Sequence, residues 1–290
     1  QYLSTSPARD QKTIDFLAAQ IPNPFFPLLP GTSLASSTVS RAQLLQPFPQ
    51  FTSVTADANQ GYAWYHAMQL RFEKRFAHSF STSVSWTWSM MMSAISYRNP
   101  SDALPEEVIS DEDNTHRLAV TGVWELPFGR GKLWGGSLSP ALNKIVGGWQ
   151  AQGTFTGQSG PPLGFGNAIF NGNLKDIVLP KNRRTVERWF NVDAGFERSS
   201  SRQLASNIQG FSSRFSGIRA DGQNNWDLAA LKNTNIRESI RLQFRVEFIN
   251  ALNHAQFGAP RTTPSSTDFG QVTSEWAWPR IVQVGLKILF

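Results

Sequence analysis

Three features of the sequence predict an all-β fold, an antiparallel transmembrane β-barrel segment of about seven strands that is part of a larger barrel with long extracellular loops. Several segments alternate large apolar and polar side chains, the pattern of strands with one oily and one wet face. Aromatic residues make up 12% of the chain, including 10 Trp and 21 Phe, and aromatic side chains are enriched at membrane interfaces. The last nine residues, 282–290, alternate over nearly the length that a tilted strand needs to cross a bilayer.

Composition excludes several other classes. No run approaches the roughly 20 consecutive apolar residues of a membrane helix. Cysteine is absent, which excludes disulfides and thiol chemistry. The net charge of +6 raises nucleic acid as a partner, but the basic residues are spread along the chain and only 181–184 is dense. We therefore predict no nucleic-acid partner, and we interpret that cluster as a solvated loop.

The chain divides into two predicted regions. Residues 1–60 are expected to form an extracellular loop region with a short helix, because Ile14, Leu17, Ala18 and Ile21 follow helical spacing after a possible cap at Asp10. Residues 61–290 are expected to form the C-terminal portion of a transmembrane β-barrel. The opening residues lack the basic start and apolar core of a signal peptide. Either that segment was removed or the chain is the later part of a longer one.

Alternation predicts strands at 62–73, 80–90, 116–126, 149–156, 226–230, 240–248 and 282–290. Short links are expected after the first, third and fifth strands: a reversal at 74–79, a turn with a small helix between Ser139 and Gly147, and a turn at 235–239. Long links are expected after the second, fourth and sixth, including an irregular region at 157–222. Short turns on one rim and long loops on the other are typical of an outer-membrane barrel. Since an odd set of strands leaves two open edges, which lipid does not tolerate, we expect further strands upstream.

The two faces of these strands supply the candidate site residues. Charged residues on the predicted interior face are expected to pair across the lumen or to hold a plug, and tryptophans on the other face are expected to include interface anchors. The charged set comprises Arg71, Glu73, Arg117, Glu125, Asp227, Arg241, Arg245, Glu247 and Lys287. The aromatic set comprises Trp64, Trp86, Trp88, Trp124, Trp149 and Trp226.

No catalytic or metal-binding pattern stands out. The four histidines show no metal-ligand spacing, and the acidic run 110–114 lacks the glycine and spacing of a calcium loop. The stretch 129–132 has the glycines of a turn but not the spacing of a phosphate loop, and no serine stands in a nucleophile elbow. A hydrolase built on His116 and Asp113 at the rim is the weaker reading. The sequence predicts a protein that is not an enzyme and holds no cofactor or metal.

A set of motifs, taken in order, resembles one family. The motifs are PNPF (22–25) with LQPFPQF (45–51), GYAWYHAMQLRFEKRF (61–76), SWTWS (85–89), ELPFGRG (125–131), GWQ (148–150), NWDL (225–228), KN (232–233), LQFRVEFINALNH (242–254), QFG (256–258) and the final strand. Together they resemble the C-terminal barrel of Oar-like TonB-dependent receptors, the group with an N-terminal carboxypeptidase-regulatory-like domain. The resemblance covers nearly the whole chain.

The resemblance implies an outer-membrane location and energy-coupled transport through a plugged barrel. It implies as partners the outer-membrane lipid, the outer-membrane assembly machinery, and a plug domain and energy-coupling protein if the full-length chain carries them. The terminal strand resembles the signal read during assembly, and that role falls on Val284, Leu286, Ile288 and Phe290. The chain shows no plug, coupling box or regulatory-like domain. The alternatives are a passive outer-membrane pore or adhesion barrel, and a soluble lectin-like β-sandwich.

Overall fold

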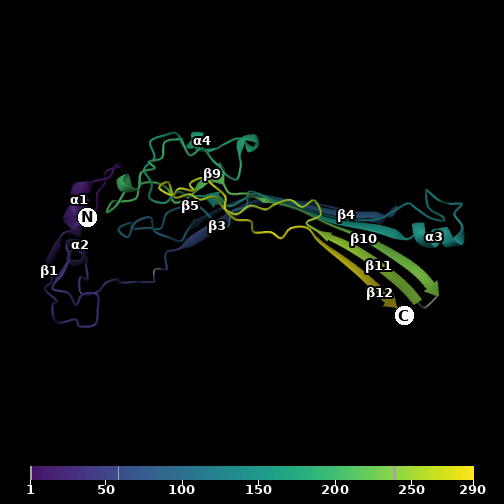
Figure 1. Cartoon of the computed structure of the whole chain (residues 1–290), viewed down its shortest axis with the longest axis horizontal. Coiled ribbons are helices and arrows are strands. Elements are labelled where there is room, and N and C mark those ends of the chain that lie inside the picture. Colours follow the sequence, from purple (N-terminus) through teal and green to yellow (C-terminus); the bar gives the residue numbers. More distant parts are fainter. Residues whose placement is uncertain (1, 58, 238–239) are drawn as a thin grey trace.

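The computed structural model describes residues 2–57, 59–237 and 240–290. Its main sheet is an antiparallel meander in which neighbouring strands follow one another along the chain (Figure 1). In order the strands are β3 (Tyr62–Ala77), β4 (Phe80–Ala94), β6 (His116–Glu125), β7 (Trp149–Gln158), β10 (Gln223–Arg237), β11 (Ile240–Ile249) and β12 (Ile281–Leu289), and β5 (Val108–Ile109) pairs with β4 at one end. The all-β, antiparallel prediction is confirmed, with strands at each of the predicted places.

The register shows why the alternation produced this sheet. Residues directly opposite one another share a face, so Leu70, Trp86 and Leu118 form one apolar row across three strands. The neighbouring row on the other face contains Arg71, Ser85 and Ala119. Sliding any strand by one residue would exchange the two faces, so the oily pattern itself fixes the register.

The remaining elements are short. Near the N-terminus lie α1 (Gln11–Ala18), β1 (Gln20–Pro22), β2 (Thr38–Ser40) and α2 (Arg41–Leu44). The links hold α3 (Pro140–Val146), β8 (Pro162–Leu163), α4 (Leu174–Ile177), two 3₁₀ turns, η1 (Lys181–Arg183) and η2 (Ser200–Arg202), and β9 (Phe215–Arg219). No helix of the described residues is long and apolar enough to cross a membrane.

The helix predicted near the N-terminus is shorter than its periodicity suggested. Asp10 does cap α1, since its carboxylate accepts a hydrogen bond from the backbone N–H of Thr13 at 3.1 Å. The helix ends at Ala18, however, and Ile21 belongs to β1, which pairs with β2. The chain leaves the helix early because the residues after Ala18 pair with a strand that is distant in sequence, which a local pattern does not reveal.

Two strands extend beyond their predicted ends. The predicted reversal at 74–79 is only the pair His78–Ser79, both with positive φ, and 74–77 stay in β3 with a register irregularity between Lys74 and Ala77. β10 runs far past the predicted 226–230 because β7 and β11 pair with it on both sides. The turn predicted at 235–239 falls partly on 238–239, which lie outside the described residues.

The third link differs from the prediction of a short turn. Residues 126–148 separate β6 from β7, a stretch as long as the 95–115 link on the opposite rim. The predicted small helix is present as α3, capped by Ser139, whose Oγ accepts a hydrogen bond from the backbone N–H of Leu142. The simple alternation of short and long links therefore fails at this one position.

The hydrophobic core lies outside the sheet, in the long links. We call the packed links 95–115, 159–222 and 250–280 the loop body. Its core is made of aromatic and aliphatic side chains, among them Phe165, Phe190, Phe196 and Phe269, which pack with ring centroids 4.7–6.2 Å apart. The region predicted as irregular is thus poor in regular elements but tightly folded.

Candidate functional site

The polar face of the main sheet gathers all nine charged residues predicted to share one face. The register places Arg71 opposite Ser85, Asp227 opposite Thr154 and Glu247 opposite Ala229, with hydroxyl and amide side chains between the charges. The register thus puts these residues on one face, as the alternation predicted. Its role as a barrel lumen wall stays a prediction.

A groove with a volume of about 540 Å³ runs across this face. Charged side chains from strands at both ends of the sheet line it, including Glu73 on β3, Asp227 on β10, and Arg245 and Glu247 on β11. The floor between them combines hydroxyl and amide side chains of the intervening strands with the apolar side chains of Val123 and Ala229; the polar ones belong to Ser81, Ser83, Thr121, Gln152 and Thr154. A floor of this mixed kind with charged walls fits a wetted face of the sheet.

Most of the charges on the polar face are already engaged. Arg71 pairs with Glu73 at 3.1 Å along the same strand, and Arg245 pairs likewise with Glu247. Glu125 forms an ion pair with Lys132 of the following link at 3.1 Å. Since the first two pairs lie along strands and the third lies at the strand end, they leave the groove open instead of tying opposite walls together. Exposed pairs of this kind are each worth about 0–1 kcal/mol, so they are weak contributors to stability.

Asp227 has a different role from the other charges. Its carboxylate accepts hydrogen bonds from the backbone N–H of Asn250 at 2.9 Å and from the side chain of Asn225 at 3.0 Å. Asn250 has a positive φ and its buried amide bonds to the carbonyls of His254 and Trp278. The INALNH motif is therefore a scaffold that ends β11 and starts the link to β12. The Asn pattern in the sequence could have predicted a turn here.

The six predicted interface tryptophans all lie on the apolar face. Trp64 and Trp226 are near the loop-body ends of β3 and β10, whereas Trp124 and Trp149 lie at the opposite ends of β6 and β7. Trp86 and Trp88 occupy the middle of β4. An interfacial anchor belongs near a strand end, so the geometry suits the first four better than the two in β4. The anchoring role itself stays a prediction.

The residues proposed for assembly line the apolar face of β12. Val284 is opposite Val246, Leu286 opposite Phe244 and Ile288 opposite Leu242. Phe290 follows the strand and is fully exposed. Of the described strands, only β11 pairs with β12, and only β4 pairs with β3, so the sheet has two open edges.

Buried carboxylates join the parts of the loop body. Asp113 has no exposed side-chain area, pairs with Arg219 at 2.7 Å, and accepts a hydrogen bond from the backbone N–H of Met91 at 2.6 Å. Glu106 pairs with Arg98 at 2.6 Å and also accepts from the hydroxyl of Ser212 at 3.0 Å. These contacts lock the 95–115 link onto the 159–222 link. The acidic run 110–114 was expected only to lack a calcium site, and a stretch without periodicity gives no signal of such pairing.

Burial and hydrogen bonding oppose each other at Glu106. Burial alone would raise the pKa of its carboxyl, but the hydrogen bonds from Arg98, Ser213 and Ser212 outweigh that effect and lower the pKa below its usual value. The group therefore stays ionised in the folded loop body at neutral pH.

The two residues of the weaker hydrolase reading both have other partners. His116 stacks on Trp86 with ring centroids 5.9 Å apart, and Asp113 pairs with Arg219. That the protein is not an enzyme stays a prediction. In the part of the chain that the structure describes, no three His, Cys, Asp or Glu side chains come together as a metal site would require.

The two-faced antiparallel sheet, with long links folded at one rim, defines the class of a membrane β-barrel wall. A family model described as an outer membrane beta barrel domain matches residues 8–283, and the chain belongs to that family. The protein is therefore located in the outer membrane. Neither the curated proteins nor the solved structures include a significant match.

Proposed function

We propose that the chain forms the C-terminal barrel portion of an Oar-like TonB-dependent outer-membrane receptor, supplying wall strands, loops and an assembly signal. The observation that carries the proposal is the pair of open edges at β3 and β12. In hydrocarbon, unpaired backbone groups cost several kcal/mol each, so further strands must cover both edges. A barrel larger than this sheet has room for a plug, which energy-coupled transport requires.

The polar face supports the same proposal. Its charged side chains pair along strands, and those of Glu73, Arg245 and Glu247 line an open groove of about 540 Å³, so the pairs leave the space in front of this face free for a plug. The role is non-enzymatic. Its partners are the membrane lipid, the assembly machinery, a plug domain and an energy-coupling protein, with no nucleic acid among them.

A passive pore or adhesion barrel is the competing function, and the loop body favours it in part. A densely packed aromatic core beyond the sheet gives a rigid surface of the kind an adhesin presents. The same body also serves a receptor, for which rigid loops position a substrate. A receptor differs from a passive pore in having its lumen closed at rest, and from an adhesion barrel in binding an energy-coupling protein.

The test uses the full-length protein reconstituted in planar bilayers. A plugged receptor gives no steady conductance, and its purified form binds the C-terminal domain of the energy-coupling protein in a pull-down. Steady open-channel conductance with no such binding would identify a passive pore. A silent barrel that also fails to bind the coupling domain would favour the adhesion barrel.

A further inference from the structure

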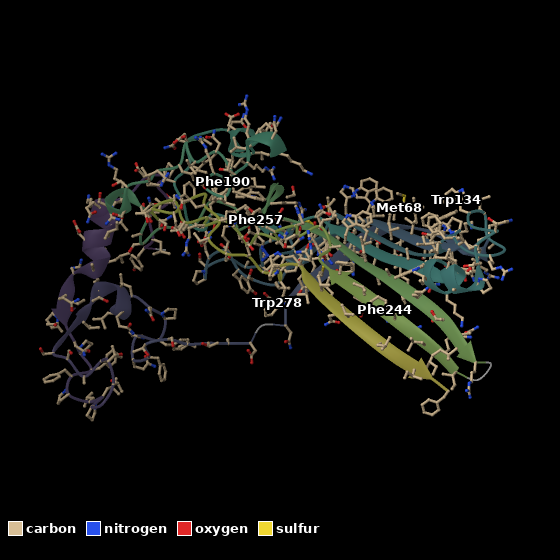
Figure 2. The ribbon with its side chains drawn as sticks, turned by 45° about the vertical axis from the view of Figure 1, so that its right-hand side comes forward. Met68, Trp134, Phe190, Phe244, Phe257 and Trp278 are labelled. Atoms are coloured by element: carbon tan, nitrogen blue, oxygen red, sulfur yellow. The ribbon has the colours of Figure 1, made fainter. Side chains whose placement is uncertain are left out.

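The 126–148 link, which we call the rim link, lies at the end of the sheet remote from the loop body. Figure 2 shows Trp134 far from Phe190 and Phe257. The backbone N–H of Glu125 bonds to the carbonyl of Ser79 at 2.8 Å, so the rim link begins beside the two-residue turn between β3 and β4. Tight turns mark the periplasmic rim of outer-membrane barrels, which gives the rim link its side of the membrane.

Internal hydrogen bonds and close packing hold the rim link in one conformation. Trp134 returns to Pro127 and Gly129 through two backbone hydrogen bonds of 2.9 and 2.8 Å, and its ring packs on Phe128. The side chain of Asn143 in α3 accepts a hydrogen bond from the backbone N–H of Arg130 at 2.7 Å. Gly129 approaches α3 so closely that an added Cβ would lie 2.8 Å from Asn143 Oδ1. These contacts fix the helix to the preceding loop.

This structure nevertheless leaves its largest apolar side chains outside. The exposed fractions are 77% for Leu133, 53% for Trp134, 51% for Leu142 and 66% for Ile145. On α3, successive side chains are about 100° apart, so Leu142, Ile145 and Val146 share one sector while Asn143 and Lys144 lie on the other. A folded segment that turns its apolar sector outward presents an interaction surface.

The apolar face of the sheet continues into the rim link. Trp149 lies on that face opposite Lys232, and its indole N–H donates a hydrogen bond to the carbonyl of Ile145 at 3.1 Å. Lys232, on the same face, donates to the carbonyl of Gly147. The C-terminal end of α3 is therefore joined to the face that meets lipid.

The charges of the rim link indicate what binds its apolar surface. Between 126 and 148 there are three cations, Arg130, Lys132 and Lys144, and no carboxylate. Lys132 is engaged with Glu125, while no ion pair of Arg130 or Lys144 occurs among the described residues. Exposed apolar side chains on one sector, with unopposed cations outside that sector, are typical of a segment that lies in a membrane interface with anionic headgroups. We propose that the rim link is a lipid-binding foot, which inserts its apolar side chains into the periplasmic leaflet and binds anionic phospholipid through Arg130 and Lys144.

The experiment uses single cysteines, since this chain contributes none of its own. Ile145→Cys carries an environment-sensitive fluorophore in the full-length protein, and Ser201→Cys in the loop body is the distant control. Both are folded, as checked by heat modifiability, into phosphatidylcholine vesicles containing acyl-chain-brominated lipid, with or without phosphatidylglycerol. Strong quenching of the label at 145 but not at 201 is expected. Equal, weak quenching at the two positions would overturn the proposal.

Charge variants test the headgroup specificity in the Ile145→Cys background. Arg130→Gln should lower the equilibrium constant for lipid contact about fivefold with phosphatidylglycerol present, because one cation near an anionic surface is worth about 1 kcal/mol. Arg130→Lys should restore it. If the extent of quenching is the same with Arg130 intact as in Arg130→Gln, and the same with and without phosphatidylglycerol, the proposed binding of anionic phospholipid is refuted. Protection of position 145 in whole cells without quenching in vesicles would instead indicate a covering periplasmic protein, and would overturn the foot.

Discussion

The ion pair of Asp113 and Arg219 shows how single residues hold the loop body together. Asp113 lies in the 95–115 link and Arg219 ends β9, so the pair joins segments that are distant in sequence. The guanidinium also donates to the carbonyls of Asp113 and Gly160. Removing one member of such a pair leaves the other charge buried without compensation, which costs more than the intact pair contributes.

Asp113→Asn should therefore loosen the loop body. We expect the free energy of local opening to fall by about 3 kcal/mol, the lower end of the range for a broken buried pair, because Arg219 is partly exposed. Hydrogen exchange of the 95–115 and 159–222 links measures it. The matched control is Asp193→Asn, which removes an exposed pair with Arg188 and should change opening by less than about 1 kcal/mol. Equal effects of the two substitutions would contradict this account.

Glu106 makes the loop body sensitive to acid. Its carboxyl has a folded-state pKa below the ordinary value of 4.5, so its contribution is fully present above that value. As the pH falls from about 4.5 through the folded-state pKa, the carboxyl is protonated and the contribution is lost. Protease resistance of the loop body should differ between wild type and Glu106→Gln at neutral pH, and the difference should shrink over that acidic range. If the difference in protease resistance stays constant down to low pH, it does not come from the ionised carboxylate of Glu106.

At the scale of the element, the two faces of each strand respond oppositely to charge. Leu70 and Gln69 are neighbours in the middle of β3, but Leu70 shares the apolar face with Trp86 and Gln69 lies opposite Thr87 on the polar face. Leu70→Arg should destabilise the folded barrel by about 2–4 kcal/mol, as arginine on a lipid face near the bilayer midplane does. Gln69→Arg should cost little. Urea unfolding of the full-length protein in vesicles measures both, and equal costs would mean that the assigned faces are wrong.

The end of β12 gives a matched pair for the assembly role. Phe290→Asp should lower the amount of heat-modifiable barrel in outer membranes, because it removes the exposed aromatic end of the predicted assembly signal. Leu289→Asp introduces the same charge one residue earlier, on the polar face where Leu289 lies opposite Arg241, and should be tolerated better. If both variants assemble as well as wild type, β12 does not carry the signal.

Sequence predicted the strands because each one repeats with period two, a signal that needs only neighbouring residues. β4 was the clearest, with Trp86 and Trp88 alternating with Ser85 and Thr87, and its register agrees with the faces expected. The prediction failed where structure depends on partners distant in the chain. β10 is long because two strands pair with it, and the loop body forms because Phe165 meets Phe269 across links with no periodicity.

For the candidate site too, local alternation was predictable from the sequence and tertiary contacts were not. The common face of Arg71, Asp227 and Arg245 follows from alternation and was predictable. That Asp227 holds the turn at Asn250, and that the rim link folds with an apolar outer sector, depend on tertiary contacts. Local rules did predict the small helix between Ser139 and Gly147 in the Gly-rich segment 126–148, but they gave no sign of the side-chain and backbone contacts that fold the rest of this link.

At the scale of the whole molecule, the chain places its rigid core beyond one rim of the sheet and its apolar foot at the other (Figure 1). The N-terminal region joins the loop body as well: Ser4 exchanges two backbone hydrogen bonds with Ser206 and Ile208, and Arg9 donates to the carbonyl of Gln203. The sheet between the two rims therefore depends on its strand pairing and on lipid for stability. Its two open edges decide whether it can close into a barrel by itself.

The open edges predict that β3 and β12 are not neighbours in the assembled barrel. We expect no disulfide between Gln69→Cys in β3 and Gly285→Cys, Gln283→Cys or Lys287→Cys in β12, tested one pair at a time in the full-length protein. A disulfide needs Cα atoms within about 7 Å, and the three β12 positions test several registers of a direct β3–β12 pairing. The positive control is Arg245→Cys with Gly285→Cys, which are register partners on β11 and β12. Efficient oxidation of any β3–β12 pair under conditions that oxidise the control would show that the sheet closes on itself, and the larger barrel would then have no basis.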